Sequence, residues 1–253
     1  VAGPGLMASG GLRCRFGVTA AVPASVHGVA EVRCVSPPHG STGWASLELL
    51  SFDGSLGGGG FFYEARAWVS LVLPLLGPVE GGTRLTVLGS HFRESSELAC
   101  RFGLGSDAPA VAARFIDSGR MECASPAVAG ASARSVEVSS NGQQFSAHGV
   151  AFTYAAAAAV SSVWPVQGAA EGGTPLTVHG GGFSRASESV GVLTCRVGGA
   201  VRRGAWASAS ALVCNATRAT AGEARVEVSN NAREYTSSGV RVRLVSLRVG
   251  DVQ

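Results

Sequence analysis

The ten residues Glu-Gly-Gly-Thr-Arg-Leu-Thr-Val-Leu-Gly, at positions 80–89, return about 90 residues later as Glu-Gly-Gly-Thr-Pro-Leu-Thr-Val-His-Gly, at positions 171–180. A phenylalanine follows each copy at the same offset, Phe92 after the first and Phe183 after the second. Self-similarity at a fixed period indicates a chain built from repeated structural units.

A cysteine motif follows the same period. Cys-Arg-Phe-Gly occurs at positions 14–17 and 100–103, and Cys-Arg-Val-Gly occurs at 195–198. A second cysteine follows each motif, and the second cysteines at 34 and 123 begin a Cys-x-Ser-Pro sequence. The motif occurs three times, although the Glu-Gly-Gly-Thr stretch occurs only twice, so the chain contains three copies of the repeat and the first copy is incomplete.

A short alternating segment, Leu-Glu-Leu or Val-Glu-Val, also appears three times, at positions 47–49, 136–138 and 226–228. Its period of two predicts β-strands whose aliphatic side chains share one face, with Glu48, Glu137 and Glu227 at solvated positions on the other. Turn-forming Asp or Asn residues follow each segment. No ten-residue segment has a clear helical period, and the glycine runs at 57–60 and 180–182 are interpreted as turns. The sequence predicts an all-β chain of tandem antiparallel β-sandwiches.

The copies also predict the domain boundaries. An incomplete repeat, without its N-terminal strands, is expected over residues 1–65, and complete repeats over residues 67–155 and 158–244. Residues 245–253 are expected to begin a further repeat. The alanine run at 155–159 is too short for a stable helix in water and is interpreted as a linker. The chain is expected to be a piece of a longer array.

This ordered set of landmarks resembles the IPT/TIG domain. The resemblance covers nearly the whole chain and is strongest in the second repeat, whereas the third has Cys-Asn-Ala-Thr at 214–217 in place of Cys-x-Ser-Pro. It implies an immunoglobulin-like fold and a tandem array of binding or spacer modules, as in plexins, Met-type receptors and large surface proteins. The family also includes intracellular transcription factors that bind DNA through loops of this fold, so the fold does not determine the function.

The cysteines form one pair in each repeat, which predicts one disulfide inside each domain. The expected pairs are Cys14 with Cys34, Cys100 with Cys123, and Cys195 with Cys214. Closing a loop of about twenty residues stabilises a domain by roughly 3 kcal/mol. Disulfides persist in oxidising compartments, so the chain is expected to follow the secretory pathway to the cell surface or the extracellular space. The alternative is buried free thiols in a cytosolic protein.

Composition excludes several enzyme classes. All 20 basic residues among the 253 are arginine, so no phosphate-binding, Schiff-base or kinase lysine is present. No Gly-x-Ser-x-Gly motif occurs, and one recurring glutamate per domain does not provide the paired carboxylates of glycosidases. A zinc site would need clustered ligands, and the nearest approach, Cys34 with His39, does not recur in the other repeats. We therefore predict a non-enzymatic protein with no catalytic residues, no cofactor and no metal site.

Two apolar stretches, at 69–79 and 150–164, are shorter than the roughly 20 residues that a bilayer-spanning helix needs, so no membrane span is predicted. Asn215 begins the sequence Asn-Ala-Thr and is a candidate N-glycosylation site. Arg202, Arg203, Arg241 and Arg243 allow two interpretations. They contact phosphates or an anionic glycan, or they lie at strand ends and edges and discourage edge-to-edge aggregation. The second interpretation is favoured.

These observations favour a non-enzymatic extracellular structural or adhesion module, part of an array of immunoglobulin-like repeats at a cell surface or in an extracellular matrix. The expected partners are other proteins or glycans of that surface or matrix and the neighbouring repeats of the same chain, without nucleic acid. Two alternatives remain. One is an intracellular DNA-binding regulator with Rel-like domains. The other is an accessory glycan-binding segment of a larger secreted protein.

Overall fold

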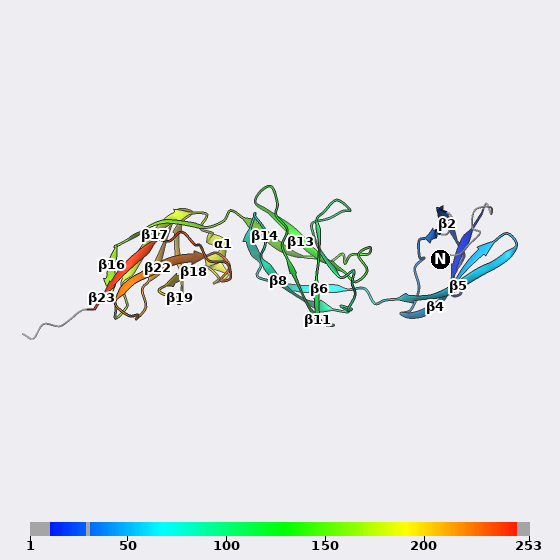
Figure 1. The fold of residues 1–253 in the computed structure, drawn as a ribbon, viewed down its shortest axis with the longest axis horizontal. Coiled ribbons are helices and arrows are strands. Elements are labelled where there is room, and N and C mark those ends of the chain that lie inside the picture. The colour runs from blue at the N-terminus through cyan, green and yellow to red at the C-terminus, as the bar shows by residue number, and fades with distance from the viewer. Residues whose placement is uncertain (1–10, 29–30, 247–253) are drawn as a thin grey trace, which may run out of the picture. The chain divides into compact units, whose positions relative to one another are not determined.

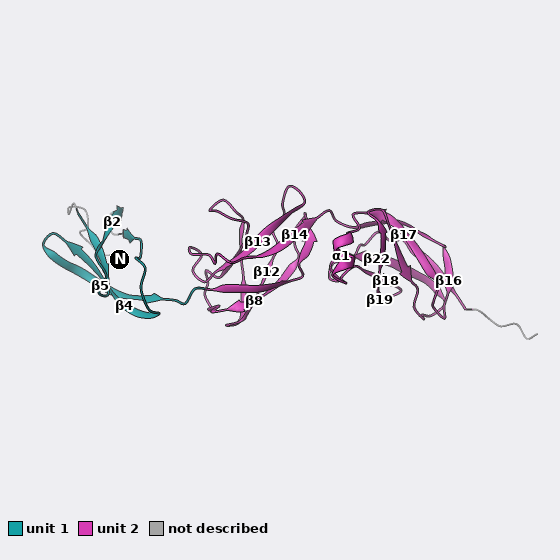
Figure 2. Cartoon of the chain, turned by 180° about the vertical axis from the view of Figure 1, so that it is seen from behind, with its two compact units in different colours: residues 1–66 teal, residues 67–253 magenta. Residues whose placement is uncertain are grey.

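The computed structural model describes residues 11–28 and 31–246, whose regular secondary structure is β-strand apart from one five-residue helix, α1 (Arg185–Ser189). The chain divides into two compact units, residues 1–66 and 67–253 (Figure 2). The all-β prediction is confirmed. The predicted beginning of a further repeat at 245–253 lies, from residue 247 onward, outside the described residues.

In unit 1 the described residues form a single five-stranded sheet in the order β3-β2-β1-β4-β5. The strands are β1 (Arg13–Phe16), β2 (Val22–His27), β3 (Glu31–Cys34), β4 (Gly43–Ser51) and β5 (Gly54–Tyr63). The prediction of a turn at residues 57–60 is wrong, because these glycines lie inside β5 and pair with β4. A side chain at Gly60 would place its Cβ 2.9 Å from the ring of Trp44, so glycine there leaves room for the tryptophan.

Unit 2 contains two sandwiches (Figure 1). Their strand orders match. In the middle sandwich, sheet β11-β12-β8-β6 packs on sheet β10-β9-β13-β14-β7. Its strands are β6 (Trp68–Leu73), β7 (Leu76–Pro78), β8 (Arg84–Ser90), β9 (Ala99–Phe102), β10 (Ala110–Ala112), β11 (Arg114–Asp117), β12 (Arg120–Ala124), β13 (Ser132–Ser139) and β14 (Val150–Ala155).

In the C-terminal sandwich, sheet β15-β17-β21-β20 packs on sheet β16-β23-β22-β18-β19. Its strands are β15 (Ala159–Trp164), β16 (Gln167–Ala169), β17 (Pro175–Gly181), β18 (Thr194–Val197), β19 (Ala200–Arg203), β20 (Ala205–Ser208), β21 (Ala211–Asn215), β22 (Gly222–Ser229) and β23 (Arg241–Val245). Residues 156–158 connect the two sandwiches without regular structure. Helix α1 precedes β18, and its N-cap Ser184 accepts a hydrogen bond from the Ser187 amide.

The repeated Leu-Thr-Val stretch forms an interior strand of each sandwich. Leu85 and Val87 on β8 are buried, as are Leu176 and Val178 on β17, and both strands lie between two hydrogen-bonded neighbours. The glycine that ends the stretch sits against the backbone of the adjacent strand in its sheet, β6 for Gly89 and β15 for Gly180. A Cβ at Gly89 would lie 1.9 Å from the Trp68 carbonyl oxygen, so only glycine fits there. The motif therefore provides two buried aliphatic side chains for the core and the glycine that the close contact between strands requires.

Tyr154 on β14 provides a pH-dependent test of the core. It is buried against Phe152, and this burial raises the pKa of Tyr154 to about 12. In an unfolded chain tyrosine ionises near pH 10, with a pKa of roughly 10. Above that pH the unfolded state gains a phenolate that the folded state does not form, so the free energy of unfolding is expected to fall between about pH 10 and pH 12.

The test compares the parent chain with Tyr154→Phe by urea unfolding at a series of pH values from neutral to alkaline. The variant is expected to lose less stability across the alkaline range because it has no hydroxyl to ionise. The same alkaline loss in both proteins would show that Tyr154 does not cause it.

Candidate functional site

Each sequence-predicted cysteine pair is joined as a disulfide in the structure: Cys14–Cys34, Cys100–Cys123 and Cys195–Cys214. The Cα–Cα distances are 6.2, 6.4 and 6.1 Å, within the usual range for a disulfide. In the middle sandwich the bond links β9 of one sheet to β12 of the other, and in the C-terminal sandwich it links β18 to β21. In unit 1 it links β1 to β3. These bonds cross-link the two layers of both sandwiches.

An arginine–glutamate pair recurs beside each disulfide. The arginine after the first cysteine lies opposite the glutamate of the alternating strand, giving the ion pairs Arg15–Glu48, Arg101–Glu137 and Arg196–Glu227. The three glutamate side chains are 35%, 3% and 14% exposed, respectively. The expectation of a solvated glutamate is therefore wrong for Glu137, because the guanidinium opposite it compensates the buried charge.

A loop that follows the glutamate strand covers the arginine in both sandwiches. The Arg101 guanidinium lies 4.1 Å from the centre of the Phe145 ring, and that of Arg196 lies 4.3 Å from the centre of the Tyr235 ring. The Tyr235 hydroxyl also hydrogen-bonds Thr194 Oγ1 at 3.0 Å. These contacts fix the loop over residues 230–236 to the sheet of the C-terminal sandwich. That loop forms the junction with the middle sandwich.

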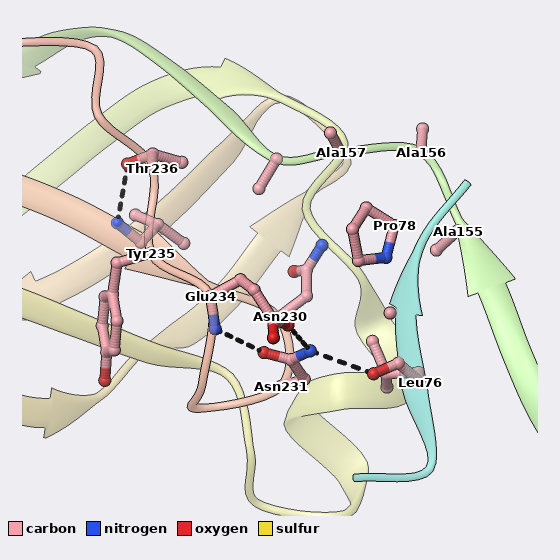
Figure 3. A pocket seen from close by; sticks show the side chains of 13 residues that line it. Leu76, Pro78, Ala155, Ala156, Ala157, Asn230, Asn231, Glu234, Tyr235 and Thr236 are labelled. Carbon is pink, nitrogen blue, oxygen red and sulfur yellow. Dashed lines mark hydrogen bonds between the residues drawn. The ribbon is translucent and has the colours of Figure 1, made fainter. Parts of the chain in front are cut away.

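The junction is a hydrogen-bonded contact between the two sandwiches (Figure 3). Asn231 Nδ2 donates to the backbone carbonyl oxygen of Leu76 at 3.0 Å and also to the Glu234 carboxylate. Glu234 Oε2 accepts a further hydrogen bond from Thr83 Oγ1 at 3.3 Å. Asn231 Oδ1 accepts from the backbone amides of Arg233 and Glu234, at 3.0 and 3.1 Å. One asparagine thus shapes its own loop and binds the preceding sandwich.

A cavity of about 130 Å³ lies beside these hydrogen bonds (Figure 3). Leu76, Pro78 and the alanines at 155–158 line one side, and the loop with Asn230 and Tyr235 lines the other. Small-molecule sites usually enclose roughly 300 Å³ or more. The cavity is therefore a packing feature of the junction, and the arrangement determines how one sandwich is held on the next.

The middle sandwich has the same loop without the contact. Asn141 Oδ1 accepts from the amides of Gln143 and Gln144, both at 3.1 Å, as Asn231 does in its own loop. Asn141 is exposed, whereas Asn231 is 5% exposed. The sequence predicts both asparagines only as turn residues and does not predict the junction. The only available signal was the Asn-x-x-Glu spacing at 231–234, which pairs an amide with a carboxylate.

We predict that Asn231→Ala lowers the free energy of unfolding of the C-terminal sandwich by about 1–2 kcal/mol, because it removes the hydrogen bond to Leu76 as well as the turn. Asn141→Ala is the matched control and removes only the turn. Hydrogen exchange of amides in residues 226–236 and 136–146, measured by mass spectrometry, reports the two losses separately. Equal losses at the two positions would show that the interdomain hydrogen bond contributes nothing.

The remaining predicted residues lie apart from the junction. Asn215 is exposed at the end of β21. Arg202 and Arg203 lie on β19, an edge strand, whereas Arg241 and Arg243 lie on β23, between β16 and β22. The favoured interpretation, that these arginines lie at strand ends and edges, agrees with Arg202 and Arg203 on β19 and with Arg241 at the first position of β23. It is wrong for Arg243, which lies inside an interior strand.

Within residues 11–28 and 31–246, no group of three or more His, Cys, Asp and Glu side chains is placed to hold a metal ion. In the same part of the chain, no helix has the length and apolar character needed to cross a membrane.

Comparison with protein families gives a match to the IPT/TIG domain at residues 68–154 and 158–242. None of the curated proteins compared with the sequence matches it. Among solved structures, the plexin A4 full extracellular region is 14% identical, with a TM-score of 0.44, and the match covers 95% of this chain and 26% of that one.

Two further structures are also similar. The SGBP-B protein of the Bacteroides ovatus mixed-linkage glucan utilization locus is 11% identical, with a TM-score of 0.29, and the match covers 93% of this chain and 61% of that one. Invasin, a bacterial integrin-binding protein, is 10% identical, with a TM-score of 0.26 and coverage of 95% and 54%. The chain spans about a quarter of the length of the plexin chain.

Proposed function

The chain belongs to the IPT/TIG domain family, and from that premise we propose that it is a non-enzymatic extracellular module. It would form one stretch of an array of immunoglobulin-like repeats at a cell surface or in an extracellular matrix. This proposal rests on one observation, that each sandwich and unit 1 contain one internal disulfide. The three bonds account for all six cysteines. Such bonds persist in oxidising compartments and are rare in the cytosol.

The proposed organisation has an incomplete repeat at residues 1–65, complete repeats at 67–155 and 158–244, and the start of another from 245. Unit 1 supports the first assignment because β1, β4 and β5 pair in the same order as β9, β13 and β14 of the middle sandwich. Its described residues contain no counterpart of β8, the strand of the Gly-Gly-Thr stretch. The disulfide and the Arg15–Glu48 pair occupy the same places as in the sandwiches.

The proposed partners are proteins or glycans of the surface or matrix, together with neighbouring repeats of the same chain. The junction at Asn231 supports the last of these, because it joins consecutive sandwiches by side-chain hydrogen bonds to backbone and hydroxyl groups. In repeat proteins each unit contacts its neighbours along the chain, and stability includes these interface contributions. The junction therefore fits a structural role in an array.

Labelling of intact cells tests the location. An antibody raised against residues 67–246 is expected to label unpermeabilised cells or their matrix, and protease added outside is expected to remove the signal. Labelling that requires permeabilisation and lies in the nucleus would contradict the proposal and favour the DNA-binding alternative. A cytosolic antigen exposed to the same protease serves as the control for cell integrity.

Asn215 provides a second, independent test of the secretory route. It is exposed, and the four strands of its sheet, β15, β17, β20 and β21, contain no Asp, Glu, Lys or Arg, so a glycan would cover an uncharged face. Chain secreted from the native host is expected to lose mass on treatment with a peptide N-glycosidase. Asn215→Gln should abolish that shift, and Asn141→Gln, outside any sequon, should retain it. An unchanged mass in the parent chain would refute glycosylation at Asn215.

A further inference from the structure

Three arginines gather on the outward face of the sheet β16-β23-β22-β18-β19 in the C-terminal sandwich. Arg225 on β22 lies directly opposite Arg241 on β23, and Arg243 follows two residues further along β23 on the same face. All three are exposed, while the alternate residues Val226 and Val242 are buried. We call Arg225, Arg241 and Arg243 the arginine face. Glu223 lies opposite Arg243, so the face keeps an excess of positive charge.

The arginine face differs from the paired arginine of the neighbouring strand. On the neighbouring strand β18, Arg196 is paired with Glu227. Within the described residues, the guanidinium groups of Arg225, Arg241 and Arg243 make no hydrogen bond or ion pair. Like charges placed directly opposite each other on adjacent strands destabilise a sheet. The Arg225–Arg241 pairing therefore has a cost that no contact in the described structure offsets.

Neither edge protection nor the fold requires these arginines. Strand β23 is interior, so charges on it protect no edge. The middle sandwich has small uncharged residues in the same register, with Ser135 opposite Ala151 and Ala133 opposite Thr153. A sheet of this architecture therefore forms without the charges. A ligand of opposite charge would explain their presence.

We propose that the arginine face binds a sulfated polysaccharide. A guanidinium presents a planar fork of donors that matches the oxygens of a sulfate group, often with two parallel hydrogen bonds. Side chains opposite each other on a sheet are roughly 5 Å apart, so Arg225 and Arg241 converge on one anionic group while Arg243 reaches the next along an extended polymer. Gln167, exposed on β16 beside Arg243, adds an amide for a sugar hydroxyl.

The choice of a glycan over a nucleic acid rests on the proposed extracellular function, where sulfated polysaccharides are available and duplex DNA is not a usual ligand. The experiment uses the full chain and immobilised heparin as the sulfated probe, with desulfated heparin and duplex DNA in parallel. The test variant Arg225→Ser, Arg241→Ala, Arg243→Thr replaces each arginine with the residue found at the equivalent position of the middle sandwich. The charge-matched control, Arg84→Ser, Arg120→Ser, Arg218→Ser, removes three exposed arginines elsewhere.

The parent chain and the control are expected to bind heparin alike, and the test variant about tenfold or more weakly. The slope of log affinity against log salt concentration should be steeper for the parent than for the test variant, by roughly two to three released ions. Desulfation of the heparin should abolish binding of the parent. Equal loss in both variants would show that net charge alone is responsible. No loss in the test variant, or tighter binding of duplex DNA than of heparin, would also overturn the proposal. These outcomes leave the surface-labelling test untouched, so the two proposals fail separately.

Discussion

Replacing Glu137 by alanine is expected to lower the free energy of unfolding of the middle sandwich by about 3 kcal/mol. The Glu137 side chain is 3% exposed and is paired with Arg101, which is 18% exposed and packed under Phe145. Removing the carboxylate leaves the guanidinium partly buried without its counter-charge, and Arg101 Nε already has no hydrogen-bond partner. The penalty is therefore that of an uncompensated buried charge, which far exceeds the value of an exposed ion pair.

The same substitution in the other two pairs provides the matched series. Glu48→Ala removes the more exposed pair of unit 1 and is expected to cost less than about 1 kcal/mol, with Glu227→Ala intermediate. Native-state hydrogen exchange measures each loss of stability where it occurs. Strands β9 and β13 report on the middle sandwich, β1 and β4 on unit 1, and β18 and β22 on the C-terminal sandwich. Equal losses in all three would show that burial does not set the value of the pair.

Removing the disulfide of the middle sandwich, by Cys100→Ala with Cys123→Ala, is expected to cost about 3 kcal/mol. The bond closes a loop with a sequence separation of 23 residues and joins the two sheets through a core in which Cys100 is fully buried. Without it the unfolded chain regains the entropy that the loop closure had removed. A marginally stable sandwich would lose most of its stability.

Urea unfolding of the double variant, beside the parent chain with and without reductant, measures this effect. The variant and the reduced parent are expected to show similar losses in the middle sandwich, because both lack the Cys100–Cys123 bond. The C-terminal sandwich of the variant retains Cys195–Cys214 and serves as the internal control. A variant as stable as the oxidised parent would mean that this bond has no stabilising role.

Much of the fold follows from short repeated motifs in the sequence. The Leu-Thr-Val stretch alternates in the period of a strand, and the structure places its aliphatic residues in the core of both sandwiches. The cysteines recur as one pair per repeat, and this spacing predicted the disulfide that the structure shows inside each domain. These features are local in sequence or repeated at a fixed period, and the repetition distinguishes them from chance.

Features that depend on contacts between distant residues were not predictable in the same way. The burial of Glu137 depends on a loop aromatic, Phe145, that folds over Arg101. The role of Asn231 depends on a carbonyl group in another sandwich, and the backbone carbonyl of Leu76 leaves no mark in the sequence. Gly60 was predicted to lie in a turn because the sequence does not show why glycine is needed at this position. Glycine is needed because the ring of Trp44, on the neighbouring strand, occupies the space of a side chain. In each case the deciding partner is remote in sequence.

The most direct test of the central claim is the state of the cysteines in secreted, unreduced chain. Alkylation under denaturing conditions is expected to find no free thiols, and peptide mapping is expected to recover the links 14–34, 100–123 and 195–214. Six alkylated thiols, or links that connect different repeats, would contradict the assignment of this chain as an extracellular array with one covalent cross-link in each module.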